Sequence, residues 1–216
     1  ADELGLNGFS SATSSAIVGE EYGVFFGDAW ARNNDGSLSL DALGFPKVAD
    51  QQKIVGNPNP DWRAGIGNTI NFKGLTLNFL IDIKHGGDVW NGTKGALKYF
   101  GVHGSQDWET TADKDLKTWT DGTIQEGETF RGYVEDFGGG DVAVTEVAYY
   151  RGPFSGFTGP SEPNIEDGGF VRLRQVSLAY SFSGQSFRDA TGLRSIDVSA
   201  TGRNLLLFTD YSGIDP

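Results

Sequence analysis

The sequence predicts an all-β fold, namely an antiparallel transmembrane β-barrel segment of about five strands with one long extracellular loop. Three observations predict it: long stretches of alternating apolar and polar residues, abundant glycine, and connections of very unequal length. The chain of 216 residues contains 32 glycines, and 12% of its residues are aromatic. Such a composition is typical of strands joined by many turns. We therefore treat residues 1–216 as one partial β-barrel domain.

Five stretches of alternation give the expected strands. They lie near residues 22–30, 62–72, 75–85, 170–182 and 194–208. A tilted strand needs about 10 residues to cross a bilayer, whereas strands of soluble domains average about 5–6 residues. The polar positions of these stretches carry mostly small side chains, which suit a water-filled or plugged lumen. The stretch near 22–30 is shorter and less regular than the other four.

Two of the strands interrupt their own alternation. In the stretch 170–182 the apolar parity changes near Arg174, because Val171 and Leu173 lie on the opposite parity from Val176. A β-bulge, or emergence of the strand above the membrane, would explain the change. In the stretch 194–208 the interruption falls at Asn204.

The connections between the strands are strongly unequal. Lys73-Gly74 predicts a tight hairpin between two long strands. Residues 86–169, by contrast, form a long excursion with 15 acidic and 6 basic residues, which we expect to be the extracellular loop. Short turns on one side and long loops on the other are typical of outer-membrane barrels. A structureless loop of this length would be unusual inside a compact soluble domain.

Composition excludes several classes of protein. The chain has no cysteine, so a disulfide scaffold and cysteine-ligated zinc are excluded. Its formal net charge of −12 argues against nucleic acid as a partner, because phosphate contacts need clustered Lys and Arg. No apolar run reaches the roughly 18 residues of a transmembrane helix. The polar mean hydropathy of −0.33 is weak evidence for solubility, since barrel strands average out as polar.

Three stretches carry a resemblance to a known family. They are IVGNPNPDWRAGIGNTINFKGLTLNFLIDIKHGGDVWNGTKGALKYFG, FVRLRQVSLAYSF and SATGRNLLLFTDYSGIDP. In content, order and approximate spacing they resemble the C-terminal barrel portion of the SusC/RagA-like TonB-dependent outer-membrane transporters. The resemblance runs from about Val18 to Pro216 and so covers nearly the whole chain.

The resemblance implies a fold and a function. The fold would be a plugged barrel of about 22 strands. The implied function is import of glycans or peptides across the outer membrane of Gram-negative bacteria. A SusD-like surface lipoprotein would serve as lid, and TonB would supply energy through the plug. A portion of such a barrel implies membrane lipid and the rest of the barrel as partners.

This sequence also departs from the family pattern. We find no plug domain and no TonB-interacting segment, and the family normally continues past the YSGIDP position. About five strands cannot close a barrel, since the smallest have about eight. Open edges in lipid would leave backbone groups unpaired at several kcal/mol each. We therefore expect the chain to be a portion of a larger transporter or one chain of a split transporter.

Aromatic residues in the long loop are the candidate contacts for a ligand or partner. Exposed aromatic side chains stack on sugar faces or anchor a protein partner. The candidates are Trp90, Trp108, Trp119, Tyr149 and Tyr150. The alternative is that these side chains pack the small core of the loop itself.

We expect no catalytic site, no cofactor and no metal site, and hence no enzyme. The oxygen-rich turn Asn33–Leu38 lacks the terminal Glu of a calcium loop. His85 and His103 have no metal-ligand spacing, and pairs such as Glu126 and Glu128 are typical of a solvated surface. The alternative to the transporter is a soluble all-β glycan-binding module. A glycoside hydrolase would need a cleft with two carboxylates, which nothing in the sequence singles out.

Overall fold

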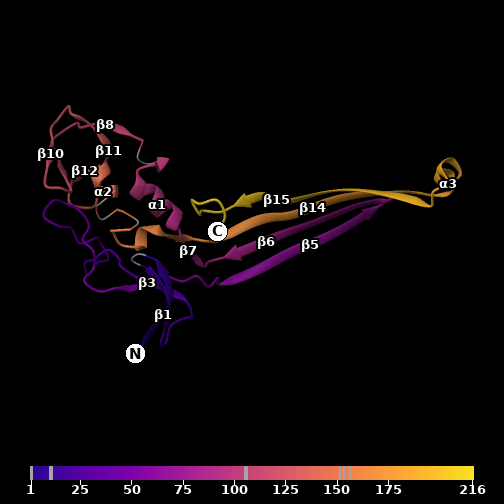
Figure 1. The fold of residues 1–216 in the computed structure, drawn as a ribbon, viewed down its shortest axis with the longest axis horizontal. Helices are drawn as coiled ribbons and strands as arrows, with labels where there is room; N and C mark the ends of the chain where they lie inside the picture. The colour runs from indigo at the N-terminus through magenta and orange to yellow at the C-terminus, as the bar shows by residue number, and fades with distance from the viewer. Residues whose placement is uncertain (1, 10–11, 105–106, 151, 153, 156) are drawn as a thin grey trace. The chain divides into compact units, whose positions relative to one another are not determined.

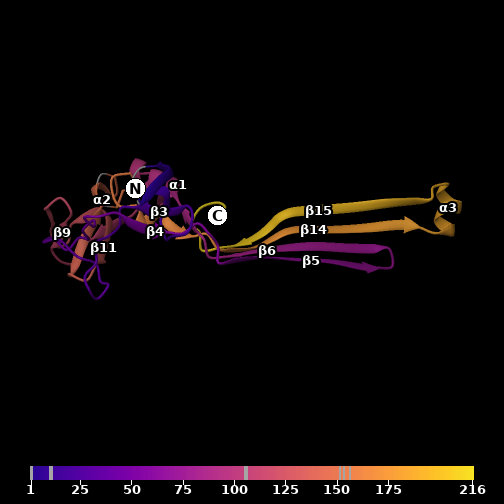
Figure 2. The ribbon, with the colours of Figure 1, turned by 90° about the horizontal axis from the view of Figure 1, so that it is seen from below.

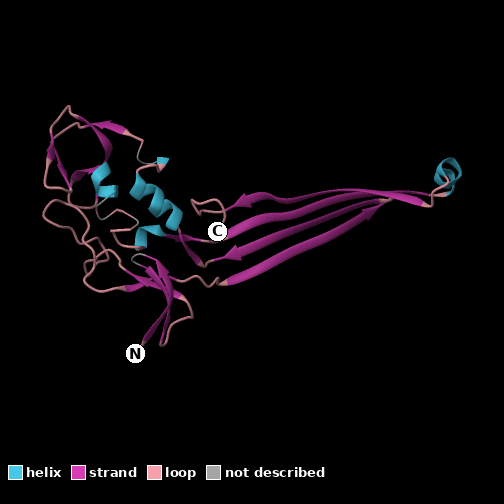
Figure 3. Cartoon of the chain, viewed as in Figure 1, coloured by secondary structure: helices cyan, strands magenta, loops and turns pink. Residues whose placement is uncertain are grey.

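The computed structural model describes residues 2–9, 12–104, 107–150, 152, 154–155 and 157–216. Strands dominate the described chain, and its helices are few and short (Figure 3). None of the helices within these ranges is long and apolar enough to cross a membrane. The chain divides into two compact units, each of which is discontinuous in sequence. Unit 1 comprises residues 1–59 and 88–166, and unit 2 comprises residues 60–87 and 167–216.

Unit 2 is a single four-stranded antiparallel sheet in the order β15-β14-β6-β5. Its strands are β5 (Trp62–Phe72), β6 (Leu75–His85), β14 (Phe170–Ser183) and β15 (Ser195–Phe208). They lie side by side in two perpendicular views (Figures 1 and 2). A short helix, α3 (Gln185–Thr191), connects β14 to β15. All four strands occupy nearly the residues that the alternation predicted.

The hairpin between β5 and β6 is as tight as expected. Phe72 and Leu75 are paired, so only Lys73 and Gly74 form the turn. Both have positive φ, 46° and 86°, which is the backbone of the two-residue turns that match the twist of the strands. The carbonyl of Gly74 also accepts a hydrogen bond of 2.9 Å from the backbone N–H of Ser181, which fixes the turn to β14.

A β-bulge explains the change of parity in β14. The pairing of β14 with β6 shifts between Leu173 and Gln175, so Arg174 is an extra residue. Of the two expected explanations, the bulge is confirmed. Leu173 and Val176 then lie opposite Ile81 and Phe79, two residues apart on one face of β6. Arg174 instead donates a hydrogen bond of 2.7 Å to Asp82.

At the same level, β15 carries two residues where β14 carries one. Its pairing jumps from Leu206 to Arg203, so Asn204 and Leu205 are outside the regular register. Asn204 has φ of 50°, a left-handed conformation that Asn tolerates better than most residues. The side chain of Leu205 folds over Gly202, where an added Cβ would lie only 2.8 Å from it. A larger residue at position 202 would therefore displace the Leu205 side chain.

These irregularities leave one apolar face and one polar face on the sheet. The apolar face includes the exposed residues Ile66, Ile70, Phe72, Leu75, Leu178, Tyr180, Phe182, Val198 and Leu206. On the polar face, short side chains bond across the strands, such as Thr69 to Asn78 at 2.5 Å and Ser177 to Thr201 at 2.9 Å.

Unit 1 contains two larger sheets and one small strand pair. The first sheet has the order β1-β2-β3-β4. Its strands are β1 (Glu3–Phe9), β2 (Ala12–Ile17), β3 (Val24–Gly27) and β4 (Lys53–Gly56). The pair joins β7 (Asp88–Trp90) to β13 (Ile165–Asp167). Among the described residues of unit 1, the short helices are α1 (Gly92–Phe100), α2 (Glu146–Tyr150) and the 3-10 helix η2 (Glu162–Asn164).

The second sheet of unit 1 has the order β10-β9-β12-β11-β8, in which only β9 and β12 are parallel. Its strands are β8 (Glu109–Thr111), β9 (Leu116–Thr118), β10 (Thr123–Ile124), β11 (Thr129–Asp136) and β12 (Asp141–Thr145). Strand β12 supplies both cores of this region. Val142 and Val144 pack with Phe45 and Ala148, whereas Ala143 packs with Leu116 and its neighbours.

Two expectations differ from the structure. Of the strand expected near 22–30, only Val24–Gly27 is a strand, and it pairs with β2 and β4 rather than with the long strands. Gly23, with φ of 82°, ends any extension toward the N-terminal side. The long loop 86–169 is also not structureless, because its described residues include short strands of 2 to 8 residues and the helices α1 and α2. Strands this short carry too few residues for an alternation to be recognised.

Candidate functional site

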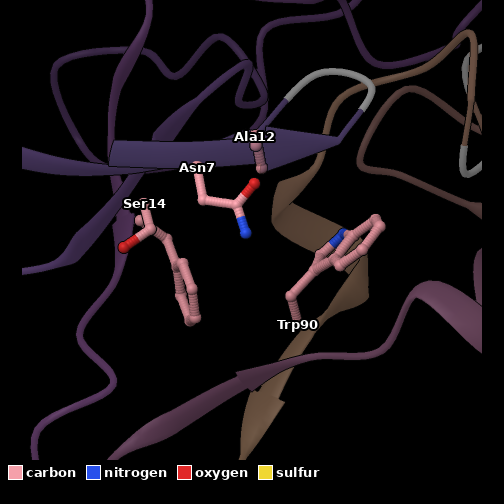
Figure 4. A pocket seen from close by; sticks show the side chains of 6 residues that line it. Asn7, Ala12, Ser14 and Trp90 are labelled. Carbon is pink, nitrogen blue, oxygen red and sulfur yellow. The ribbon is translucent and has the colours of Figure 1, made fainter. Parts of the chain in front are cut away.

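A cavity of about 330 Å³ in unit 1 is the candidate binding site. It is lined by Asn7, Gly8, Ala12, Ser14, Phe25 and Trp90. Figure 4 shows the Asn7 amide and the Trp90 indole directed into the same hollow from different strands. Of the aromatic candidates from the sequence, Trp90 lines this cavity.

The sheet register aligns three of the lining residues. Asn7 pairs with Ser14, and Ser14 pairs with Phe25, so the three form one row across β1, β2 and β3. Residues directly opposite in neighbouring strands present their side chains on the same face. The Ser14 hydroxyl donates its hydrogen to the Gly23 carbonyl at 3.1 Å. The hydroxyl oxygen can therefore still accept a hydrogen bond from a ligand. The row thus supplies an amide, a hydroxyl and an aromatic ring.

Trp90 enters the cavity from the other side, at the end of β7. An added Cβ on Gly92 would lie 2.7 Å from the indole, so this close approach requires glycine. The next residue, Asn91, is only 2% exposed and begins α1 by accepting a hydrogen bond of 2.9 Å from the backbone N–H of Lys94. Its own N–H donates to the Asn164 carbonyl at 2.7 Å. These bonds hold the backbone on both sides of the Trp90 position.

Charged groups behind α1 add to this support. The Lys94 ammonium lies 2.5 Å from Glu166, and both side chains are mostly buried. Burial and, to a smaller extent, the neighbouring Lys94 lower the pKa of Lys98 to about 8, against the opposing effect of Glu166. Burial likewise lowers the pKa of His103. Neither Lys94 nor Lys98 lines the cavity, and its described lining residues are all uncharged.

The lining suits a neutral ligand with a flat or ring-shaped surface. Phe25 and Trp90 offer aromatic faces, and Asn7 and Ser14 offer hydrogen-bonding groups. Pockets that combine apolar walls with a few convergent polar groups are typical of small-molecule sites. A sugar ring or an uncharged peptide segment has these complementary features.

The other aromatic candidates are not brought to this cavity. Trp108 is 41% exposed and makes an edge contact with Tyr133 at a centroid distance of 5.5 Å. Trp119 packs against the cluster around Phe45, which is the core-packing alternative. Tyr149 and Tyr150 lie in α2, but their side chains are outside the described part of the chain.

The polar lining residues and Phe25 could not be predicted from the sequence. Asn7, Ser14 and Phe25 lie in strands of four to seven residues, and their relation depends on pairing between separate strands. Only the sheet register brings them together. An alternation search detects single strands, so it could not find a row across three of them.

No group of three or more His, Cys, Asp or Glu residues in the described ranges could hold a metal ion. The turn at Asn33–Leu38 is closed by its own hydrogen bonds. One carboxylate oxygen of Asp35 accepts from the N–H of Ser37 at 3.0 Å and from its hydroxyl at 2.6 Å. These bonds lower the pKa of Asp35. The turn is accordingly a self-capped polar turn.

The two units differ in which side chains they bury. Every buried hydrophobic side chain among the described residues belongs to unit 1. The buried side chains of unit 2 are instead Lys84 and Arg172, at 7% and 9% exposure. Arg172 lies 4.6 Å from the Phe170 ring and pairs with Asp215. Unit 2 therefore buries two charged side chains and exposes the hydrocarbon of its apolar face.

Comparison with known sequences gives relatives of a single kind. No family model matches the chain. TonB-dependent receptor P3 of Formosa agariphila is 30% identical over 177 residues, which are 82% of this chain and 15% of that protein. TonB-dependent receptor P26 of the same organism is 27% identical over 233 residues, covering 100% of this chain and 21% of that protein. The chain thus spans about a fifth or less of the length of these curated relatives.

Solved structures of similar fold agree with the sequence relatives. The RagAB peptide importer in its closed-closed state matches 100% of this chain and 22% of its own with a TM-score of 0.57 and 18% identity. Its open-open state matches 100% and 21% with a TM-score of 0.58 and 17% identity. At these identities the likeness establishes the fold alone.

Proposed function

Because this chain is a SusC/RagA-like relative of the TonB-dependent receptors, we propose that it forms part of the barrel wall of an outer-membrane nutrient importer. The nutrient would be a glycan or a peptide, and TonB would supply the energy through a plug domain. A SusD-like surface lipoprotein would cover the extracellular opening. These activities belong to the whole transporter. The curated relatives are about five times longer than this chain.

The main support for the proposal is that unit 2 exposes the hydrophobic side chains of one face of its sheet. In water, a sheet that exposes Ile66, Leu178 and Val198 on one face would be covered or would aggregate. In a bilayer the same face would contact acyl chains, and the polar face would line the lumen. The strands of 11 to 14 residues are long enough for the crossing.

The edges of the sheet support a larger closed barrel. Strands β5 and β15 each have one edge without a partner among the described strands. Unpaired backbone groups in lipid cost several kcal/mol each, so a spanning sheet must be closed. Further strands of the same transporter would close it on both sides.

The orientation follows from the connections. Only Lys73 and Gly74 connect β5 to β6, and short turns face the periplasm in outer-membrane barrels. Residues 88–166 connect the opposite ends of β6 and β14, so they would lie on the extracellular side. There the cavity with Trp90 would contact the transported glycan or peptide, and exposed Trp108 would contact the lid.

Membrane fractionation of the natural full-length protein tests the wall. We expect it in the outer-membrane fraction and soluble only with detergent. A folded protein in plain buffer would overturn this proposal and favour a soluble glycan-binding module, for which the cavity with Trp90 is the specific support.

Substitution in the cavity tests the ligand contact. Trp90→Ala is expected to weaken binding of oligosaccharides or oligopeptides to the purified transporter by about tenfold, since a stacked aromatic contributes about 1 kcal/mol or more. Trp108→Ala removes an exposed tryptophan from the same unit and is the matched control. If both variants bind the ligand as tightly as the unchanged protein, the cavity does not contact the transported ligand.

A further inference from the structure

The hairpin end of the unit 2 sheet contains a second cavity, of about 400 Å³. It lies where the Lys73-Gly74 turn, the last residues of β14 and the first turns of α3 meet. Its lining residues are Lys73, Gly74, Tyr180, Ser181, Phe182, Ser183, Ser186 and Phe187. The bond from the Ser181 N–H to the Gly74 carbonyl holds the turn against β14, so the two sides of the cavity are fixed together.

Aromatic rings form one side of this cavity and continue the apolar face. Tyr180 and Phe182 meet edge to face at 4.6 Å, and Phe187 stacks on Phe182 at 6.5 Å. Tyr180 and Phe182 remain 40% and 45% exposed. Aromatic residues of this kind occur where a membrane protein passes from hydrocarbon to headgroups.

The other side of the cavity is polar and cationic. Ser186 and Lys73 line it, and the Lys73 ammonium lies 5.3 Å from the Phe72 ring. Ser181 and Ser183 also line it, but they have the opposite parity on β14 from Tyr180 and Phe182. No acidic residue is among the described lining residues. Hydroxyl and ammonium donors next to a hydrocarbon surface match the linkage region of a phospholipid.

The charge around the cavity runs against that of the chain. Residues 71–76 and 180–197 carry three basic and two acidic residues, although the chain as a whole has a net charge of −12. The three bases are Lys73, which lines the cavity, and Arg188 and Arg194, which follow its lining residues in the sequence. In the described part of the chain none of the three forms an ion pair. Of the two acids, Asp189 accepts a hydrogen bond from Gln185 at 3.0 Å, and Asp197 is paired with Ser181 in the sheet register. Three cations are therefore available to an external anion.

We propose that this end of the sheet binds an anionic phospholipid of the periplasmic leaflet. The headgroup phosphate binds Lys73, Arg188 and Arg194, while the Ser186 hydroxyl bonds to the glycerol-ester region. The acyl chains lie along Tyr180 and Phe182 and continue over the apolar face. The inference rests on the proposed function, since it requires the sheet to span the membrane with its hairpin toward the periplasm.

The test uses the natural full-length protein reconstituted in nanodiscs that contain equal parts of phosphatidylcholine and phosphatidylglycerol. Native mass spectrometry then measures which lipid remains bound after activation. We expect phosphatidylglycerol to be retained in preference to phosphatidylcholine. The triple variant Lys73→Gln, Arg188→Gln, Arg194→Gln is expected to lose this preference by on the order of tenfold or more, since each basic residue near an anionic surface favours binding severalfold.

Two further variants keep the test specific. Lys73→Arg with Arg188→Lys and Arg194→Lys conserves the charges and should retain the preference. Arg63→Gln removes an equally exposed cation from the far end of β5 and should also retain it. A loss of preference in Arg63→Gln equal to that in the triple variant would mean that net charge, and not this site, selects the lipid.

The outcomes separate the two proposals. Equal retention of both lipids by a correctly inserted wild-type protein would overturn the lipid site and leave the barrel wall intact. Failure of the wild-type protein to insert at all would instead overturn the barrel wall. Release of phosphatidylglycerol by inorganic phosphate at an equal concentration would show that the site recognises the bare anion, which also overturns a lipid site.

Discussion

The two units bury opposite kinds of side chain. Unit 1 fully buries Phe45, Leu116 and Val144, whereas unit 2 exposes Ile66 and buries only Lys84 and Arg172 among its described side chains. Both follow the same physical rule, because each unit places its hydrocarbon away from water. For unit 1 the place away from water is its own interior, and for the sheet, under the proposed function, it is the surrounding lipid. Burial therefore identifies a core only after the solvent of that region is known.

The comparison also separates two sources of stability. Unit 1 gains free energy by removing apolar area from water, at about 25 cal/mol per Å². A lipid-facing sheet gains little from this effect and depends on its backbone ladder, which must be complete in a medium without water. Truncating a buried hydrophobic side chain should therefore lower the stability of unit 1. Placing a charge on the apolar face, or straining the backbone of a strand or turn, should lower the stability of unit 2.

Phe45→Ala is expected to have the largest effect. Phe45 is fully buried between Val142 and Val144, and such truncations cost about 3–5 kcal/mol. Thermal unfolding of the purified full-length protein, followed by tryptophan fluorescence, should show a large loss for unit 1, since Trp119 packs on this cluster. Val18→Ala, at a residue 79% exposed, should be close to neutral. Equal effects of the two substitutions would contradict a water-excluded core.

Leu178→Lys should cost about 2–4 kcal/mol if Leu178 faces the middle of the bilayer. The neighbouring Ala179→Lys places the same charge on the polar face and should be tolerated far better. Folding into lipid vesicles, measured by the shift in electrophoretic mobility between unheated and heated samples, distinguishes the two. A similar loss of folded protein in both variants would show that the two faces do not meet different solvents.

Gly74→Ala should cost about 1–2 kcal/mol, because a Cβ is strained at φ of 86°. The added carbon would also lie 3.1 Å from the Ser181 carbonyl oxygen. Gly65→Ala in β5 is the matched control, since its Cβ would meet nothing within 4 Å. Urea titration of the protein folded in vesicles compares the midpoints, and a midpoint for Gly74→Ala equal to that of the control would refute the tight turn.

Lys98→Met should give the smallest effect, and a pH-dependent one. Burial holds the folded pKa of Lys98 at about 8, against 10.5 in the unfolded chain. Between these values the unfolded state binds a proton that the folded state does not, so stability rises with pH in wild type. The variant should be more stable than wild type at neutral pH, with the difference shrinking as pH rises through about 8 toward 10.

The melting temperature of unit 1, recorded across this pH range, measures that difference. Lys114→Met is the opposing control. The Asp141 carboxylate raises the pKa of Lys114, so removing this lysine should lower stability slightly at neutral pH. A constant difference between Lys98→Met and wild type at all pH values would show that Lys98 is not held in a desolvated position.

The sequence predicted the part of the fold that depends on one strand at a time. The long strands of unit 2 were found because each carries enough residues to display its period, and the bulge at Arg174 was visible as a change of parity. Unit 1 was missed because its order depends on pairing between short, distant strands. The cavity row of Asn7, Ser14 and Phe25 is the clearest case, since no property of any one strand indicates it.

The extra residues of β14 and β15 have a consequence for assembly. Relative to β6, which has no insertion at that level, β14 has one additional residue and β15 has two. The regular spacing of backbone N–H and C=O groups along the outer edge of β15 is therefore interrupted between Arg203 and Leu206. A neighbouring strand can form a continuous ladder there only if it accommodates the same interruption. The edge thereby discriminates among candidate neighbours, and it contributes to assembling the strands in one order.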